Sequence, residues 1–339
     1  MQSTATVTIH HWSPLLVARD LTDILKRMFD FPSLTGLVAA TFTPFHEDGS
    51  VRFEKIPDYT EYLIQNGITG IYICGSTGEG PSLTIAERKA VAEAFVKAAD
   101  GRLRTIVHIG HTALAEVCDL AAHAESIGAD AISSVSPYYF KPDDTKALVD
   151  FFRVAAVSAP GLPFYYYHIP ALTGVAVNPV EFLEMGGGEI PTLRGIKFTD
   201  SDLSLMNACQ EVAEGKYDVL FGRDEMLLAG LSAGVAGAVG STYNLAPKLY
   251  QNMIQAFEAG DLTLAREWQL RSVAMIRAIV GVGGEAAIKY PMHRHGLDCG
   301  PRRLPMRQLS QVEKDEIDRR LDALGFDEWA ATTPVEVGA

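Results

Sequence analysis

The sequence predicts a (β/α)8 barrel of the TIM type, with extra C-terminal helices beyond the eighth strand. Short strand-like runs alternate with amphipathic helical stretches, and eight such units follow one another from Gly36 onward. The strand runs are continuously apolar, which is typical of a parallel sheet covered by helices. An open doubly wound sheet is the competing fold, but residues 43–49 (TPFHEDG) after the first strand are not a glycine-rich phosphate turn.

The strand candidates are short runs rich in β-branched and aromatic residues. Helical candidates with apolar residues at three- and four-residue spacing lie between them, for example at 84–99 and 114–127. In chain order, the expected strands are 37–42, 68–74, 104–109, 129–135, 163–168, 193–198, 218–221 and 235–240.

Three regions are expected along the chain. Residues 1–35 form an N-terminal extension, in which 15–29 has the spacing of a short amphipathic helix. Residues 36–245 form the barrel, and residues 246–339 hold its last helix and a C-terminal helical extension. The segments beyond the eighth strand show no strand pattern, so we expect helices that cap the barrel or form an oligomer surface.

Composition and charge exclude several classes of function. The 339 residues are 47% hydrophobic and carry a formal net charge of −13, which disfavours nucleic acid and anionic membrane surfaces as partners. No apolar run approaches the roughly 20 residues of a membrane helix, and no signal-peptide pattern opens the chain. The cysteines lie far apart without metal-binding spacing, which predicts reduced thiols in a cytoplasmic protein.

Polar residues gather where the predicted strands end. In a (β/α)8 barrel, the chemistry sits at the carboxyl ends of the strands and on the loops that follow, so we expect these clusters to converge on one mouth. The clusters are Gly75–Glu79 after the second strand, Tyr167–His168 ending the fifth, Lys197–Thr199 ending the sixth, Gly222–Glu225 after the seventh and Gly240–Thr242 ending the eighth.

Lys197 interrupts the apolar sixth strand. An ammonium on a barrel strand loses hydration, which favours the neutral amine, and a neutral amine can form an iminium with a keto acid. That iminium is an electron sink for cleavage of a C–C bond. The alternative is a lysine that extends to solvent or pairs with a carboxylate, and its position alone does not separate the two interpretations.

Tyr167 ends the fifth strand, so it is expected about 5 Å from Lys197 across the sheet. A phenol there can relay protons to and from a departing fragment. Tyr165 and Tyr166 precede it, and because strand tyrosines commonly serve packing, packing is the competing interpretation. Alternation of faces predicts Tyr165 and Tyr167 on one side of the sheet and Tyr166 on the other.

The segment Gly75–Gly80 is rich in glycine and precedes a helix expected to start near Thr84. Backbone N–H groups exposed in such a turn, with the Ser76 and Thr77 hydroxyls, suit a carboxylate. A tight connection that uses glycine for its backbone freedom is the alternative.

Other polar residues also allow two interpretations. Asp224 and Glu225 either complement a helix dipole or hydrogen-bond a polyhydroxylated substrate. Two pairs of histidines have no convergent carboxylate or cysteine, so surface or structural roles are favoured over metal binding. These pairs are His108 with His111 and His293 with His295.

Five motifs occur in order at the expected strand ends. They are GSTGE at 75–79, YYYHIPALTG at 165–174, GIKFTDSDL at 195–203, FGRDE at 221–225 and GAVGSTYN at 237–244. Together they resemble the dihydrodipicolinate synthase/N-acetylneuraminate lyase superfamily of class I aldolases, from about Gly36 to Leu324, and segment 165–174 is most similar to the lyase branch. The resemblance implies a small 2-keto acid substrate such as pyruvate, a homotetramer built as a dimer of dimers, and no metal or organic cofactor.

The resemblance also implies roles for individual residues. Lys197 matches the Schiff-base lysine and Tyr167 the proton-transferring phenol, while Tyr139 matches a tyrosine that reaches into the neighbouring subunit's site. The turn Ser76–Gly78 matches the one that holds the pyruvate carboxylate, with Thr77 also positioning Tyr167. The positions that match binding of the sugar-derived chain are Thr199, Gly222, Asp224, Glu225 and Ser241.

One departure within the superfamily bears on the substrate. Dihydrodipicolinate synthases place an arginine two residues after the proline of the fifth-strand motif, and this chain has Leu172 there. A leucine cannot pair with an anion, so synthase activity is disfavoured. The expected reaction is reversible cleavage of N-acetylneuraminate to pyruvate and N-acetylmannosamine. The rivals are a related aldolase or dehydratase acting on 2-keto-3-deoxy sugar acids, and a non-catalytic barrel that only binds a ligand.

Overall fold

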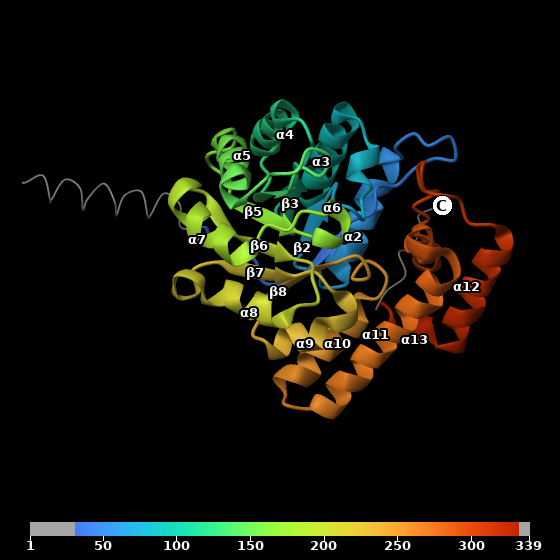
Figure 1. The fold of residues 1–339 in the computed structure, drawn as a ribbon. Coiled ribbons are helices and arrows are strands. Elements are labelled where there is room, and N and C mark those ends of the chain that lie inside the picture. Colours follow the sequence, from blue (N-terminus) through green and yellow to red (C-terminus); the bar gives the residue numbers. More distant parts are fainter. Residues whose placement is uncertain (1–30, 332–339) are drawn as a thin grey trace, which may run out of the picture. The chain divides into compact units, whose positions relative to one another are not determined.

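The structure, a computed structural model, describes residues 31–331, and its strands close into one parallel barrel (Figure 1). Each strand pairs with the next in sequence, and β8 pairs with β1. The expected (β/α)8 fold is therefore confirmed, whereas the helix expected at 15–29 lies outside the described residues. The strands are β1 Gly36–Ala40, β2 Gly70–Ile73, β3 Arg104–His108, β4 Ala131–Val135, β5 Phe164–His168, β6 Leu193–Phe198, β7 Asp218–Phe221 and β8 Gly237–Gly240.

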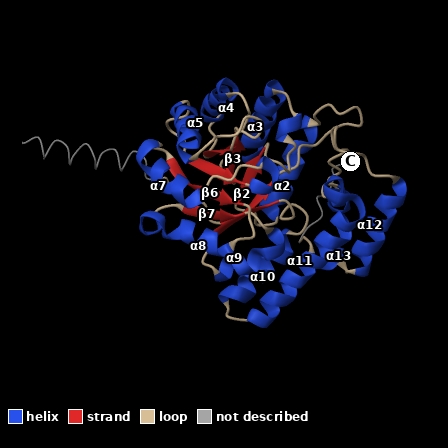
Figure 2. Ribbon diagram, viewed as in Figure 1, coloured by secondary structure: helices blue, strands red, loops and turns tan. Residues whose placement is uncertain are grey.

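Helices alternate with the strands and surround the barrel (Figure 2). A short helix, α6 Pro170–Thr173, is inserted directly after β5. The helices that cover the barrel are α2 Ile56–Gln65, α3 Ile85–Ala99, α4 Leu114–Ser126, α5 Thr145–Val157, α7 Pro179–Glu189, α8 Leu203–Glu211, α9 Leu227–Ser232 and α10 Pro247–Glu258.

Two apolar layers hold the barrel together. One cluster lies inside the ring of strands, and it includes Tyr72, Tyr165 and Tyr167. The larger cluster lies between the strands and the surrounding helices, and it includes Tyr166, which packs against Phe182 of α7. The predicted alternation of the three β5 tyrosines is thus confirmed, and Tyr167 faces the barrel interior.

Local sequence signals fix where α3 begins. The Thr84 side chain accepts the backbone N–H of Glu87, and the Glu87 side chain accepts the backbone N–H of Thr84. This capping box satisfies N–H groups that the first helical turn leaves unpaired. The helix consequently begins at Ile85, directly after Thr84, as expected.

The additional helices lie together on one side of the barrel (Figure 1). They are α11 Leu262–Gly283, α12 Gln311–Ala323 and α13 Phe326–Trp329, and 3-10 turns at Gly284–Ala287 and Tyr290–His295 connect α11 to the later segments. Helix α11 packs against α9, α10 and α12. The helices expected beyond the eighth strand are therefore present. Helix α11 also packs against the 3-10 turn in the loop after β7.

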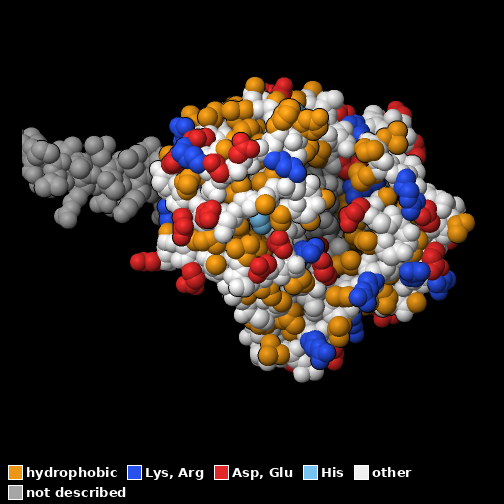
Figure 3. Space-filling view, in the orientation of Figure 1, with side chains coloured by type: hydrophobic (Ala, Val, Ile, Leu, Met, Phe, Trp, Pro, Cys, Tyr) orange, Lys and Arg blue, Asp and Glu red, His pale blue; other side chains and the backbone are white. Residues whose placement is uncertain are grey.

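Acidic and basic side chains are interspersed with hydrophobic ones over the face shown in Figure 3. Since the net charge is −13, an anionic substrate has to be attracted by local groups rather than by the overall field. None of the helices in the described part of the chain has the length and apolar content that a membrane span requires.

Candidate active site

Lys197 and Tyr167 lie side by side inside the barrel. They are direct partners in the register of β5 and β6, and the residues are only 5% and 3% exposed. The Lys197 Nζ atom lies 3.7 Å from the centroid of the Tyr167 ring. The amine and the phenol that the sequence singles out therefore share one small volume.

A second aromatic ring, from Tyr72 of β2, also faces the amine. Its centroid lies 4.6 Å from Lys197 Nζ, and its hydroxyl donates to the Ser133 Oγ atom at 2.9 Å. Among residues 31–331, no carboxylate or other hydrogen-bond acceptor binds this Nζ atom. The lysine is thus not part of a salt bridge, and its amine lies against two aromatic rings.

The Ser76–Thr77 turn lies in the loop after β2 and contacts the loop after β8. The Thr77 and Ser241 hydroxyl oxygens lie 2.5 Å apart. The backbone N–H groups of Ser76 and Thr77 have no acceptor in the described chain, and the Ser76 side chain is exposed. Two free N–H groups with adjacent hydroxyls suit the oxygens of a carboxylate.

The hydroxyl of Thr77 bonds Ser241 rather than Tyr167, which differs from the contact that the resemblance implies. The reason lies in the topology: β1 pairs with both β2 and β8, so the loops after β2 and β8 are close neighbours. In the single chain, Tyr167 is positioned by ring contacts with Tyr72 and His108.

Gly222 leaves space for the Thr199 side chain. A Cβ atom at Gly222 would lie 1.9 Å from Thr199 Oγ1, so no larger residue fits without displacing that hydroxyl. Thr199 Oγ1 is buried and has no hydrogen-bond partner in the described chain. Because buried polar atoms are normally satisfied, this hydroxyl is available to a bound ligand.

Asp224 begins the 3-10 turn Asp224–Met226 after β7, yet its carboxylate bonds the loop after β8. Its Oδ2 atom accepts the Thr242 backbone N–H at 2.8 Å and the Thr242 hydroxyl at 2.6 Å. Gln269 of α11 donates to the Asp224 carbonyl. Glu225 is more exposed and lies 3.4 Å from Arg223. Asp224 therefore links the loops after β7 and β8 by hydrogen bonds. The Glu225 carboxylate is the more exposed of the two.

Asp224→Asn is expected to change the pH dependence of stability. Burial raises the pKa of Asp224 from 3.8 to about 6, so between these values the folded chain holds a proton that the unfolded chain has released. This contribution to stability is complete below about pH 4 and is lost as the pH rises through about 6. The melting temperature of the native protein, measured relative to the asparagine variant, should consequently fall as the pH rises from about 4 to about 6. An unchanged difference would contradict the raised pKa.

His108 lies beside the two tyrosine rings and is a structural residue. Its ring centroid is 6.0 Å from that of Tyr72 and 6.1 Å from that of Tyr167, and its Nε2 atom accepts the Val135 N–H. Burial, with Arg88 and Lys197 nearby, lowers the pKa of His108 well below its usual value. No group of three or more His, Cys, Asp or Glu residues within 31–331 is arranged to hold a metal ion.

Two predicted residues lie apart from this cluster in the single chain. Tyr139, in the loop after β4, is 76% exposed and packs edge-on against Phe140. Leu172, in α6, is 68% exposed. Tyr72 was not predicted from the sequence. It lies on the predicted second strand, three residues before the GSTGE turn, and this position is a signal that could have identified it.

Comparisons with known proteins identify relatives of this chain. The profile of the "Dihydrodipicolinate synthetase family" matches residues 33–324. The N-acetylneuraminate lyase of Pongo abelii is 42% identical over 303 residues, which cover 88% of this chain and 95% of that protein. N-acetylneuraminate lyase A of Xenopus laevis is 45% identical over 278 residues, or 80% and 90% of the two chains.

A solved structure matches in fold as well as in sequence. The Proteus mirabilis N-acetylneuraminate lyase aligns with a TM-score of 0.85 at 42% identity, and the match covers 87% of this chain and 100% of that one. The family match spans nearly the whole described region, from before β1 to the end of α12. This chain therefore belongs to the dihydrodipicolinate synthetase family.

Proposed function

We propose that this protein is a Schiff-base aldolase that cleaves N-acetylneuraminate reversibly into pyruvate and N-acetylmannosamine. The observation that carries the proposal is the Lys197 amine, buried without an ion pair and next to the Tyr167 phenol. The related proteins from Pongo abelii and Proteus mirabilis are named N-acetylneuraminate lyases. A carbon–carbon lyase is the activity that fits both findings.

In the proposed reaction, the Lys197 amine attacks the substrate ketone, and water leaves as the iminium forms. Tyr167 takes the proton of the C4 hydroxyl while the C3–C4 bond breaks, so the aldehyde leaves and the bond's electron pair forms an enamine. Protonation of the enamine at C3 gives the pyruvate iminium. Water then hydrolyses it, which releases pyruvate and restores the amine.

The keto-acid carboxylate is proposed to bind at the free N–H groups and hydroxyls of Ser76 and Thr77. The hydroxylated chain of the substrate would extend towards the loops after β6, β7 and β8. There the unpartnered Thr199 hydroxyl and the partly exposed Glu225 carboxylate offer hydrogen bonds. Asp224 and Ser241 hold these loops in position.

Leu172 supports the lyase over a dihydrodipicolinate synthase. This exposed leucine offers no charge to a second substrate's carboxylate. An aldolase or dehydratase for 2-keto-3-deoxy sugar acids remains the rival within the family, because it would use the same lysine and tyrosine.

Exposed aromatic side chains and free thiols bear on the assembly and the location of the protein. Tyr139 and Phe140 expose a large aromatic surface in the single chain, which favours burial against another subunit. We infer a homotetramer in which Tyr139 completes a neighbouring subunit's site. Cys74, Cys118, Cys209 and Cys299 are free thiols, which supports a cytoplasmic location.

The substrate is tested by comparing kcat/KM for N-acetylneuraminate and for a 2-keto-3-deoxy sugar acid, with pyruvate release measured for both. We expect N-acetylneuraminate to be preferred by at least about tenfold, since one or two hydrogen bonds to its longer chain are worth that much. Preference for the shorter acid would assign the chain to the rival activity, and no pyruvate from either substrate would favour a non-catalytic barrel.

A further inference from the structure

The turn that carries Ser76 and Thr77 includes an unfavourable backbone conformation. Glu79 has φ 58° and ψ 29°, in the left-handed region that residues other than glycine seldom adopt. A conformation of this kind persists where surrounding contacts fix it. Here those contacts come from residues 289–303, beyond the barrel.

Both oxygens of the Glu79 carboxylate are bound by that segment. Oε1 lies 3.1 Å from Arg302 Nη1 and 3.4 Å from Lys289 Nζ, and Oε2 accepts the Arg303 backbone N–H at 2.9 Å. The Glu79 side chain is 0% exposed, and those of Lys289 and Arg302 are 2% and 5% exposed. Since water does not reach this carboxylate, its conformation depends on these three contacts.

Arg302 also bonds the substrate turn directly. Its Nη1 atom donates to the carbonyl of Thr77 at 3.2 Å, and its Nη2 atom donates to the carbonyl of Glu285 at 3.0 Å. One planar guanidinium thus joins the backbone of Thr77 to the 3-10 turn that follows α11. A lysine lacks this rigid arrangement of donors.

Lys289 supports the same turn from the side of β1. Its Nζ atom donates to the carbonyls of Thr43 at 2.6 Å and Pro301 at 3.0 Å, and the Thr43 hydroxyl donates to the carbonyl of Gly78 at 2.6 Å. Burial lowers the pKa of Lys289 to about 8 in spite of the Glu79 carboxylate. The ammonium is consequently held by its hydrogen bonds rather than by water.

We propose that Arg302 is a positioning residue for the keto-acid carboxylate, supported by Lys289, and that it acts through Glu79 and the Thr77 carbonyl. It keeps the N–H groups of Ser76 and Thr77 turned towards the mouth of the barrel. The proposal rests on the proposed function, because it assigns the carboxylate to this turn. The segment after α11 is then part of the substrate site rather than only a cover for the barrel.

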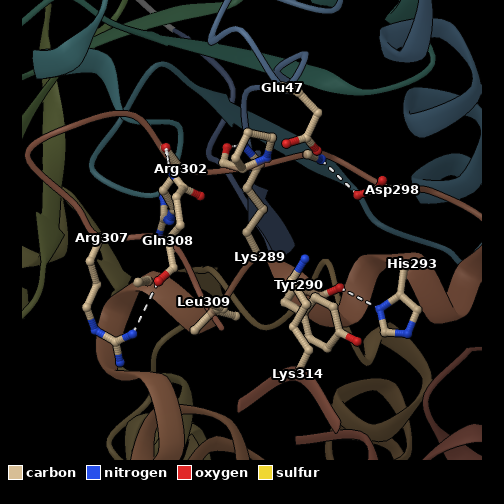
Figure 4. A pocket seen from close by; sticks show the side chains of 13 residues that line it. Glu47, Lys289, Tyr290, His293, Asp298, Arg302, Arg307, Gln308, Leu309 and Lys314 are labelled. Carbon is tan, nitrogen blue, oxygen red and sulfur yellow. Dashed lines mark hydrogen bonds between the residues drawn. The ribbon is translucent and has the colours of Figure 1, made fainter. Parts of the chain in front are cut away.

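A cavity beside Arg302 makes the proposal testable by chemical rescue. Lys289 and Arg302 line a cavity of about 250 Å³, together with Arg307 and Gln308 (Figure 4). We expect this space to admit a small cation to the volume that a shortened residue 302 leaves empty. Arg307 provides a matched control, since it lines the same cavity but pairs with Glu313 of α12.

The experiment measures borohydride trapping of pyruvate on Lys197 as a function of pyruvate concentration, alongside kcat for N-acetylneuraminate. Arg302→Met is expected to raise the half-saturating pyruvate concentration about tenfold, as for one lost hydrogen bond to a charged group. The kcat should change less than about threefold, because the lysine and phenol are untouched.

Methylguanidinium chloride, compared with sodium chloride at the same concentration, should restore the pyruvate affinity of Arg302→Met. Arg307→Met should leave both quantities unchanged.

Arg302→Lys keeps the charge beside Glu79 and provides a second variant if the methionine variant does not fold. It is expected to show an intermediate loss of pyruvate affinity. Unchanged affinity in the folded variants, or an equal loss in Arg307→Met, would overturn the positioning role. A fall in kcat with unchanged pyruvate affinity and no rescue by methylguanidinium would indicate a merely structural role. That result would also overturn the proposal. Failure of the native protein to trap pyruvate would instead overturn the proposed function, and this inference with it.

Discussion

Replacing Lys197 with methionine is expected to reduce cleavage of N-acetylneuraminate to the background rate. Loss of the nucleophile removes the covalent route altogether, and such substitutions cost on the order of 10⁴- to 10⁶-fold in kcat. Methionine has a similar length and no charge, and it suits the aromatic surroundings formed by Tyr72 and Tyr167. The variant should therefore remain folded, and pyruvate release over an extended assay measures the loss.

The matched control is Lys216→Met. Lys216 also contacts an aromatic ring, that of Tyr217, but it is exposed and lies before β7. This control should retain full activity. If Lys197→Met kept more than about one per cent of native kcat, a covalent role for Lys197 would be untenable, given the size of effect seen for nucleophiles.

Tyr167→Phe is expected to lower kcat by about 10² to 10⁴-fold, the usual contribution of a positioned general acid or base. Phenylalanine keeps the ring that lies 3.7 Å from Lys197 Nζ, so iminium formation with pyruvate should persist while C–C cleavage slows. Steady-state cleavage and borohydride trapping, measured on the same preparation, separate the two steps.

Tyr166→Phe is the control for this substitution. Its hydroxyl lies 3.1 Å from Ser136 Oγ on the other face of β5, where it serves packing between strand and helix. We expect kcat within about threefold of native for this variant, because it loses only the hydroxyl contacts with Ser136 and, at 3.5 Å, with His168 Nδ1. Equal losses in the two phenylalanine variants would indicate that Tyr167 acts only through packing.

The fold and the lysine–tyrosine pair could be predicted because they depend on local pattern. Strands β6 and β7 have the predicted bounds of 193–198 and 218–221, and the other strands end within two residues of their predicted ends. Consecutive strands of a barrel are neighbours, so Tyr167 and Lys197 at adjacent strand ends had to lie together. No long-range contact needed to be known.

Contacts between distant loops could not be read from the sequence. The pairing of Thr77 with Ser241 depends on how the barrel closes between β8 and β1, and the buried cluster of Glu79 with Lys289 and Arg302 joins residues more than two hundred positions apart. The sequence predicts Glu79 in a polar cluster at the mouth of the barrel, but its side chain is buried. The segment after α11 buries it, since Lys289, Arg302 and the Arg303 backbone contact its carboxylate.

The proposed chemistry depends on Lys197 acting as the nucleophile. Incubating the native protein with pyruvate and sodium borohydride, followed by mass measurement of the proteolytic peptides, tests it most directly. We predict a reduced pyruvate adduct on the peptide containing Lys197, absent when borohydride is omitted and absent in Lys197→Met. An unmodified Lys197 peptide at saturating pyruvate, or an adduct on Lys289 instead, would contradict the assignment.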